Sequence, residues 1–358
     1  MITVITLFPI ALVGLMMCLL PALVPPTLPF AVRIPPSRVD EPVVGRQRRR
    51  YFWGTGLVAA AGTAGAAFVS EPLRPVVAAA VLLVCLAFFS IARQAIRSAK
   101  EAEGWYLGLT QAIATDTTWR SRRVRFPWWW ALPAPAILIG TALTGALRYP
   151  HLPDRIATHF DGEGVADQVV ATSVTAAFTG VFLQAFVTVL IVGLLALSYR
   201  SRPATDAADP AGSTERYRRF LSALGPAILV LAALVNVCLL LASLQIWQLI
   251  PVTPVTLGLT AGIPLLGVVV LIAVAIRLGQ AGARLNGPAP PAKGEAVVNR
   301  DDDANWKGGL FYVNRQDPSL LVPRRFGVGW TLNLARPVAW AILVVPFAVI
   351  VLMGLLAH

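Results

Sequence analysis

The sequence predicts an all-α polytopic membrane protein of about eight transmembrane helices, with a small cytoplasmic β-containing module before the last helix. The 358 residues are 56% hydrophobic and only 13% charged, whereas about a quarter of the residues of a soluble domain are charged. Apolar runs of about twenty residues recur along the chain, and this is the length that crosses a hydrocarbon core of about 30 Å. Lys and Arg fall mainly in alternate loops.

The first predicted segment, residues 1–127, holds three spans separated by basic loops. We expect the first span, residues 1–24, to be retained, because no Lys or Arg precedes it and it ends in LVPPTLPF rather than at a small-residue cleavage site. A polar loop follows at residues 25–50, where six prolines argue against regular helix. The next spans, residues 52–70 and 73–92, form a tight hairpin, because the first is rich in Gly and Ala.

The rest of the chain is predicted to hold five further spans. The segment at residues 128–199 has spans 128–147 and 172–199, which are joined by the outer motif loop 148–170. The segment at residues 200–280 has a flexible cytoplasmic loop followed by spans 220–250 and 255–280. Residues 281–336 form a cytoplasmic linker and a compact module, and residues 337–358 form the last transmembrane helix. Gln184 and Asn236 are the main strongly polar residues deep in these spans. We expect each of them to make an interhelical hydrogen bond.

The distribution of basic residues predicts the orientation of the chain. With the N-terminus outside, only Arg74, Arg148 and Arg155 of the 30 Lys and Arg lie on the outer side. The positive-inside rule therefore predicts a multi-pass protein of the cell membrane with both termini extracytoplasmic. Basic stretches that abut the inner ends of spans are explained by contact with anionic lipids, so we expect no nucleic-acid partner.

The polar segment at residues 148–168 is the first candidate site. It contains His151 and His159, and its acidic residues are Asp154, Asp161, Glu163 and Asp167. Imidazole and carboxylate together bind zinc or another divalent ion, so His151 and His159 are candidate metal ligands. The alternative is a structured loop in which Asp154 or Asp161 caps a helix. No nucleophile–base pair is visible, so we expect neither a catalytic residue nor a cofactor.

This segment also carries a family resemblance. Its pattern Y-P-x-L-P-D-R-I-x-T-H-F-x-x-x-G-x-x-D resembles the signature of a bacterial membrane domain of unknown function. That domain also occurs in the SdpI-type immunity proteins, which protect a producing cell from its own membrane-active peptide toxin. The chain departs from the signature at Ala157, where the family commonly has Pro, and at Phe160 and Asp161, where it has Trp-Asn. The resemblance implies an outer ligand site at His159, Asp154, Arg155, Asp161 and Asp167.

The inner segment at residues 305–333 is the second candidate site. LFYVN, the turn-prone RQDPS and then LLVP predict a β-hairpin, and the preceding NGPAPPAKGEAVVNRDDD is predicted to be a linker. The pattern W-K-G-G-x-F-Y-x-N-x-x-D-P resembles a second module of unknown function found in the same bacterial membrane proteins. The residues that define this site are Trp306, Gly309, Tyr312, Asn314, Asp317, Arg325, Gly327, Gly329 and Asn333. The module would dock a cytoplasmic regulator or cap the inner interface, with Arg324 and Arg325 on anionic headgroups; we favour the cap.

These observations favour a membrane sensor or immunity-type protein whose outer loop recognises an external or membrane-embedded ligand, such as a peptide. One alternative is a transporter or exporter of a hydrophobic substrate. Another is a metal-dependent membrane enzyme that uses His151 and His159. An ion-coupled pump is disfavoured, because no Asp, Glu, Lys or His falls in the middle of a predicted span.

Overall fold

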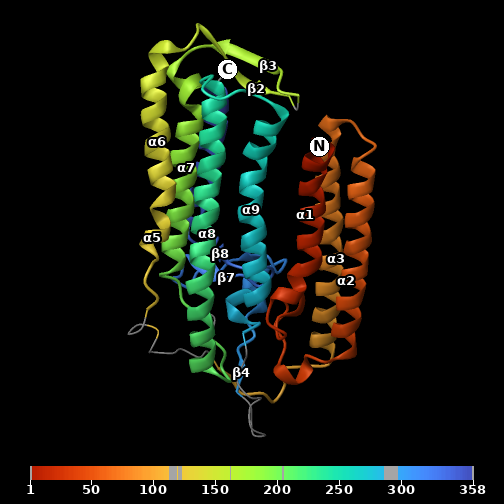
Figure 1. Ribbon diagram of the computed structural model, residues 1–358. Coiled ribbons are helices and arrows are strands. Elements are labelled where there is room, and N and C mark those ends of the chain that lie inside the picture. The colour runs from red at the N-terminus through yellow and green to blue at the C-terminus, as the bar shows by residue number, and fades with distance from the viewer. Residues whose placement is uncertain are drawn as a thin grey trace. The chain divides into compact units, whose positions relative to one another are not determined.

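The computed structural model describes residues 2–112, 119, 123–161, 163–203, 205–285 and 297–356. Long helices occur at all eight intervals predicted as spans (Figure 1). They are α1 (Ile2–Leu23), α2 (Pro42–Ala66), α3 (Arg74–Ala102), α6 (Pro133–Arg148, preceded by the single turn α5, Trp128–Ala131), α7 (Val174–Ser198), α8 (Pro210–Ile246), α9 (Pro254–Leu278) and α10 (Pro337–Leu356).

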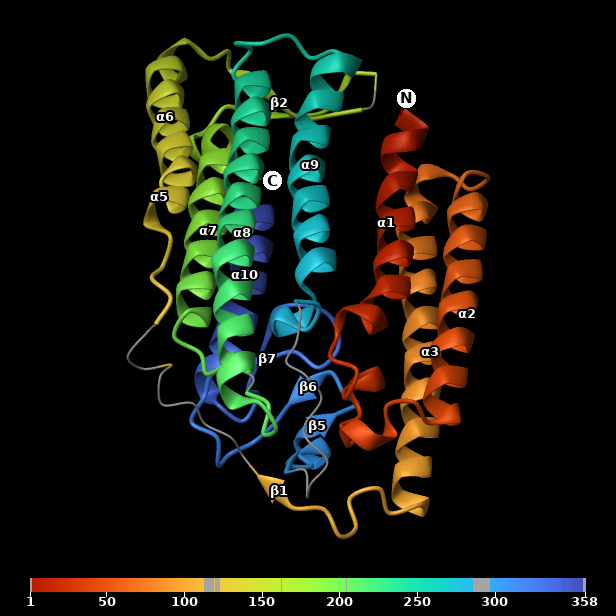
Figure 2. The same ribbon diagram turned by 60° about the horizontal axis from the view of Figure 1, so that its bottom comes forward.

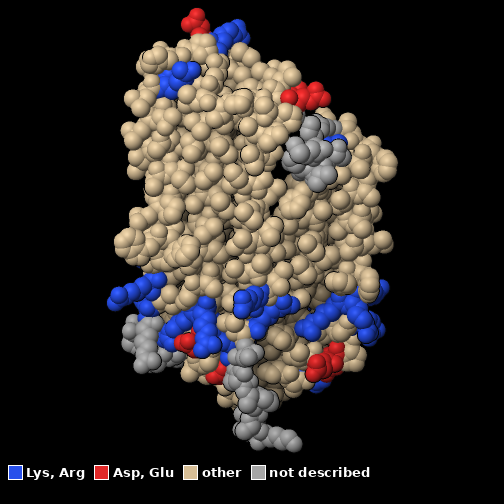
Figure 3. All heavy atoms as spheres, in the orientation of Figure 1, with Lys and Arg blue, Asp and Glu red and all other residues tan. Residues whose placement is uncertain are grey.

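Five stretches of the described chain are long and apolar enough to cross a membrane. They are α3, α7, α8, Trp128–His151 around α6 and Pro254–Gly282 around α9. Shorter apolar helical stretches lie at Leu7–Leu23 in α1 and Pro337–Val349 in α10. Charged side chains are sparse along the helices and gather near helix ends (Figure 3). The long apolar helices indicate a multi-pass membrane protein.

Proline marks the start of several helices. Those that begin at a proline are α2, α6, α8, α9 and α10. Proline suits the first helical turn, because its fixed φ fits the helix and its missing N–H would have no partner there. Two predictions were therefore wrong: α2 begins at Pro42, within the predicted loop 25–50, and the predicted loop after residue 199 becomes helical at Pro210.

The chain divides into two compact units, each assembled from pieces that are distant in sequence. Unit 1 consists of Met1–Arg123, Ser201–Phe220 and Ala275–Arg336, and unit 2 of Val124–Arg200, Leu221–Val274 and Pro337–His358. Unit 1 therefore holds α1, α2, α3 and the inner module, and unit 2 holds the outer segment. The boundaries between units fall inside α8 and α9, so these units do not follow the linear order of the predicted segments.

In unit 1, helices α1, α2 and α3 pack side by side (Figures 1 and 2). A Cβ atom added at Gly62 of α2 would lie 2.2 Å from Cγ2 of Val81 on α3, so only glycine allows this approach. The Phe30 ring packs on those of Tyr51 and Phe89, with centroids 5.1 and 6.3 Å apart. The close packing of the second and third spans that was predicted from small residues is therefore present.

In unit 2, buried amides join α6, α7 and α8. Gln184 donates to the Thr141 hydroxyl at 3.1 Å and to the backbone carbonyl of Asn236 at 2.8 Å. Asn236 donates in turn to the Thr188 hydroxyl at 3.0 Å. The predicted interhelical hydrogen bonds of Gln184 and Asn236 are confirmed, and they satisfy amide donors that would otherwise be costly among apolar helices.

The outer segment forms a β-hairpin, which the sequence analysis missed. Strand β2 (Arg155–Phe160) pairs antiparallel with β3 (Ala166–Ala171), and the register shifts between Ala157 and His159 and again at Phe160. Each strand is only six residues long, and only a minority of its residues are β-branched, so the sequence predicts these strands weakly. The hairpin is nevertheless the frame that positions every outer candidate residue that follows Asp154.

The inner module contains two strand pairs that differ from the predicted hairpin, and a third pair lies just outside it. β5 (Trp306–Lys307) pairs with β6 (Phe311–Tyr312), β7 (Leu321–Pro323) pairs with β8 (Trp330–Leu332), and β1 (Gln111–Ala112) pairs with β4 (Val298–Asn299). The prediction that LFYVN pairs with LLVP was wrong. Gly308 and Gly309, with φ of 59° and 77°, turn the chain back immediately, so β6 meets β5 first.

Candidate functional site

The outer hairpin is closed by Asp161. Its Oδ1 accepts hydrogen bonds from the backbone N–H groups of Glu163 at 2.9 Å and Val165 at 2.8 Å. Gly164 has φ of 90°, a left-handed conformation that favours glycine. The prediction that Asp154 or Asp161 caps a helix was wrong, because Ser173 is the N-cap of α7 and accepts from the N–H of Ala176 at 3.1 Å.

A small apolar core fixes the hairpin to the start of α7. Ile156 of β2 is fully buried against Ala176 and Ala177, with Leu152 packed beside them. The N–H of Thr172 donates to the carbonyl of Asp154 at 2.9 Å, which continues the strand pairing beyond β2 and β3. These contacts hold the base of the hairpin firmly, so its outward-facing side chains are presented from a fixed frame.

His159 and Asp167 form an exposed pair on this frame. The His159 Nδ1 atom lies 2.6 Å from Oδ1 of Asp167, and the two side chains are 65% and 49% exposed. The hairpin pairs His159 with Gln168, so Asp167 follows as the next residue toward the turn. An exposed pair of this kind stabilises a fold by less than about 1 kcal/mol. Its position therefore suits contact with a ligand better than a structural role.

The other outer candidates lie apart from this pair. Asp154 and His151 are exposed, and His151 belongs to a 3-10 turn at Tyr149–His151. Arg155 donates to the carbonyl of Val169 at 3.2 Å across the hairpin. Within the residues that the structure describes, no group of three or more His, Cys, Asp and Glu side chains is placed to hold a metal ion. Metal binding by His151 and His159 stays a prediction.

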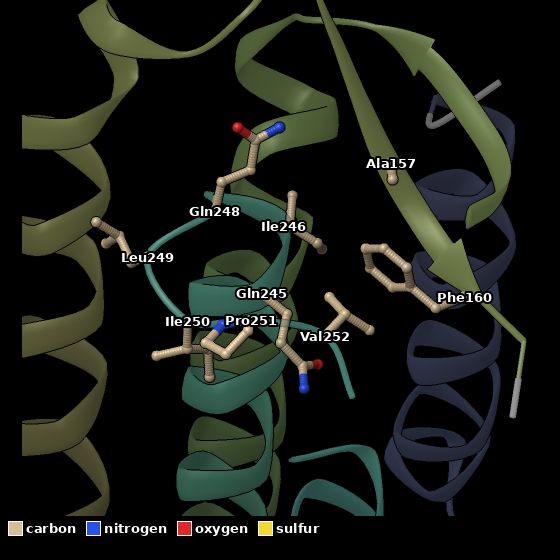
Figure 4. Close-up of a pocket in the computed structure, with 9 residues that line it drawn as sticks. All are labelled: Ala157, Phe160, Gln245, Ile246, Gln248, Leu249, Ile250, Pro251 and Val252. Carbon is tan, nitrogen blue, oxygen red and sulfur yellow. The ribbon is translucent and has the colours of Figure 1, made fainter. Parts of the chain in front are cut away.

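A cavity of about 430 Å³ lies beside the hairpin, and we call it the hairpin cavity (Figure 4). It is lined by Ala157, Phe160, Gln245, Ile246, Gln248, Leu249, Ile250, Pro251 and Val252. Ala157 and Phe160 come from β2, and the other residues come from the end of α8 and its linker to α9. Residues three apart in a regular strand point to opposite faces, so the register shifts in β2 are what bring Ala157 and Phe160 to one cavity.

Gln245 is the notable polar residue of the hairpin cavity. Its side chain is only 4% exposed, and its buried Nε2 atom has no hydrogen-bond partner in the described part of the chain. A buried donor without a partner costs about 1–3 kcal/mol. Gln245 was not predicted as a site residue, although the stretch QIWQLIP, with two amides at the outer end of a predicted span, was a usable signal.

Within unit 1, a buried charge network that was not predicted joins the inner module to α3 and to the segment after α1. Asp303 pairs with Lys100 Nζ at 2.7 Å, accepts from the N–H of Arg33 at 3.0 Å, and pairs with Arg325. Asp302 pairs with the Arg33 Nε at 2.8 Å and with Arg325. The predicted linker therefore ends in a structured acidic segment, and no sequence pattern indicates contacts between residues so far apart in the chain.

The electrostatics of the network follow from burial and pairing. Burial alone would raise the pKa of Asp302 and of Asp303. Arg325 opposes this effect at both carboxylates, aided by Arg33 at Asp302 and by Lys100 at Asp303, so both pKa values lie below the ordinary carboxyl value of 3.8. Both acids are therefore ionised at neutral pH and match the surrounding cations.

Arg325 does not lie on the membrane surface as predicted. Its side chain is 2% exposed, and its guanidinium lies over the Trp306 ring, 5.0 Å from the centroid. The paired acids hold the guanidinium inward, while Arg324 remains exposed. The prediction that Arg325 contacts anionic headgroups was wrong, because its charge is already neutralised within unit 1.

The remaining module residues form a connected polar structure. Tyr312 donates to Asp317 at 3.0 Å and accepts from Asn314 at 3.1 Å, and burial raises the pKa of Tyr312 to about 12. The buried Asn333 amide donates to the carbonyls of Asn314, Asp317 and Ser319 at 2.9, 3.1 and 3.2 Å. Asn333 therefore fixes the loop between β6 and β7 together with Arg336, whose Nε donates to the carbonyl of Asp317 at 3.0 Å.

Glycines and one further amide shape the rest of the module. A Cβ atom at Gly309 would lie 2.7 Å from the Arg93 guanidinium, and Gly327 and Gly329 have φ of 89° and 109°. Gln280, which the sequence analysis missed, accepts from the N–H of Gly329 at 2.7 Å and donates to its carbonyl at 2.9 Å. The Gln280 amide therefore bonds both backbone groups of Gly329, as the backbone of a neighbouring strand would. Together these contacts indicate that the site residues of the module mainly maintain its shape.

Fold and site together define a multi-pass membrane protein with a hairpin site in one unit and a charge-linked module in the other. Residues 136–183 match a domain of unknown function, DUF1648, which covers most of α6, the hairpin and the start of α7. Residues 315–340 match a family of unknown function, DUF5808, which covers β7, β8 and the start of α10. The chain matches no curated protein and no solved structure.

Proposed function

We propose that the chain is a sensor or immunity-type protein of the cell membrane, with eight spans and both termini extracytoplasmic. Its outer hairpin recognises an external or membrane-embedded ligand, such as a peptide. The eight long helices at the predicted intervals and the concentration of Lys and Arg in alternate loops support this topology. The resemblance of the hairpin sequence to SdpI-type immunity proteins supports the choice of ligand.

One observation carries the proposal. The exposed His159–Asp167 pair lies on a rigid hairpin that also forms one wall of an uncharged cavity. Binding sites commonly combine an apolar cavity with a few polar groups that orient the ligand. The matched domain spans this hairpin, so the stretch that matches the family and the site geometry coincide.

On the inner side, we propose contact with anionic lipids and, through the module, with a cytoplasmic regulator. The exposed Arg324 supports lipid contact, since each basic residue near an anionic surface gains about 1 kcal/mol. The module's fixed shape, maintained by Asn333 and Gln280, supports a surface that a regulator recognises.

The functional test compares survival of a deletion strain, the wild type and a His159→Ala strain against a panel of membrane-active peptides. Selective killing of the deletion and His159→Ala strains supports the proposal. His151→Ala is the matched control, because it removes an exposed imidazole from the same segment and leaves the His159–Asp167 pair intact. Equal loss in both histidine variants would favour the metal hypothesis, and equal survival of all strains would refute protection and favour the exporter alternative.

The topology is tested separately by labelling whole cells with a membrane-impermeant maleimide. In a background without the native cysteines, Glu163→Cys on the hairpin should be labelled in intact cells. Lys307→Cys, which is exposed on the module, should be labelled only after the cells are opened. The reverse pattern would invert the proposed orientation.

A further inference from the structure

We propose that the hairpin cavity binds one apolar side chain, together with the neighbouring backbone carbonyl, of an extended and uncharged peptide segment. This inference rests on the proposed function, because it names the bound group and its contacts at the same outer site. It assigns Gln245 as the residue that anchors the peptide backbone, and Ala157 and Phe160 as the wall that receives the side chain.

The lining of the cavity selects an uncharged, apolar group. None of its nine residues carries a charge, and Phe160, Ile246 and Val252 contribute apolar surface. The volume of about 430 Å³ lies within the range of ordinary small-ligand sites. A charged group would lose its hydration there without gaining an opposite charge, so the cavity discriminates against it.

Gln245 supplies the polar part of the recognition. Its Nε2 donor is buried and has no partner in the described part of the chain, although every other feature of the cavity is apolar or exposed. Because Nε2 is covered, the Gln245 side chain must rotate to turn this donor toward the cavity, where a ligand carbonyl oxygen would accept from it and remove the penalty of leaving it unsatisfied. The bound group must therefore combine apolar surface with a hydrogen-bond acceptor.

The hairpin favours a peptide over a lipid acyl chain. Among the described strands, β2 and β3 pair only with each other, so each has an edge with backbone groups that are not used in the sheet. An extended peptide pairs with such an edge and places alternate side chains in neighbouring pockets. An acyl chain cannot make these bonds. The register shifts in β2 turn Ala157 and Phe160 toward the cavity at the place where the peptide would pass.

The test is photolabelling of the full-length protein in lipid nanodiscs. The probe is the capped peptide acetyl-Ala-photoleucine-Ala-Phe-Ala-amide, and a diazirine analogue of palmitate is the parallel acyl probe. Labelled residues are mapped by mass spectrometry. We expect the peptide to label β2 or residues 245–252, and the acyl probe to leave them unlabelled.

Three variants test the assigned contacts, and each is first shown to melt as the wild type does. Gln245→Met keeps the shape but removes the donor, and should raise the half-saturating peptide concentration about tenfold. Gln168→Met, an amide change on β3 outside the cavity, is the matched control and should change it less than twofold. Ala157→Trp fills the cavity and should abolish the labelling of residues 245–252.

The outcomes separate this inference from the proposed function. Peptide labelling on the hairpin but outside the cavity, or equal effects of Gln245→Met and Gln168→Met, would overturn the cavity assignment and leave an outer peptide site intact. Preferential labelling of the cavity by the palmitate analogue would overturn the choice of a peptide. Labelling of neither the hairpin nor residues 245–252 would contradict both proposals.

Discussion

Asp303→Asn is expected to destabilise unit 1 strongly, because it removes one charge from a buried network. Asp303 pairs with Lys100 and Arg325 and accepts from the backbone of Arg33. Removing one partner of a buried ion pair costs about 3–5 kcal/mol. Lys100 keeps a second pairing with Asp301, and Arg325 keeps Asp302, so the loss should lie near the lower end, at about 3 kcal/mol.

The measurement is thermal unfolding of the purified protein, followed by tryptophan fluorescence. At about 2–4 °C per kcal/mol, a loss of about 3 kcal/mol lowers the melting temperature by about 6–12 °C. Glu101→Gln is the matched control, since it breaks an exposed 2.7 Å pair with Arg97 on α3. Such a pair contributes less than about 1 kcal/mol, so the melting temperature of the Glu101→Gln control should fall by less than about 3 °C. Equal shifts in the two variants would refute the structural role of the network.

Three further predictions follow from the same contacts. The folded-state pKa values of Asp302 and Asp303 are lowered, so the stability that these acids contribute should be fully present above pH 3.8 and be lost only as the pH falls through the lowered values. When the melting temperature is measured at decreasing pH, it should fall less in Asp303→Asn than in the wild type. Asn333→Leu should cost about 2–4 kcal/mol, because the carbonyls of Asn314 and Ser319 lose this donor, while the carbonyl of Asp317 keeps Arg336. Protease cleavage between β6 and β7 should become faster, and unchanged cleavage would contradict this prediction. Asn236→Leu removes the side-chain amide that donates from α8 to the Thr188 hydroxyl of α7. The lower melting temperature should correspond to a loss of about 1–2 kcal/mol in the free energy of unfolding. An unchanged melting temperature would show that the buried hydrogen bonds contribute little.

The helices were largely predictable from sequence, because a membrane demands long apolar runs wherever it is crossed. Apolar content identified the interval of each helix, and the polar residues Gln184 and Asn236 stood out within those runs. The ends were less predictable. The prolines at positions 42 and 210 were interpreted as breaking helices, whereas in the first turn they start them.

The candidate sites were only partly predictable. The family pattern singled out His159 and Asp167, and the structure places them 2.6 Å apart. Gln245 escaped notice because its importance depends on burial without a partner, which a sequence does not express. The inner network escaped notice for a different reason. Its acids resemble any solvated charge run until the fold brings basic residues from other segments to them.

The separation of these partners in sequence has a consequence for synthesis. Lys100 and Asp303 are 203 positions apart, and ribosomes add about 5–20 residues per second. About 10–40 s therefore pass between the synthesis of Lys100 and the synthesis of its acidic partner Asp303. During that interval, Lys100 near the end of α3 lacks its pairing with Asp303, and a chain that stops early never forms this pair. Truncated products should therefore lack the stabilisation that this charge network gives to completed chains.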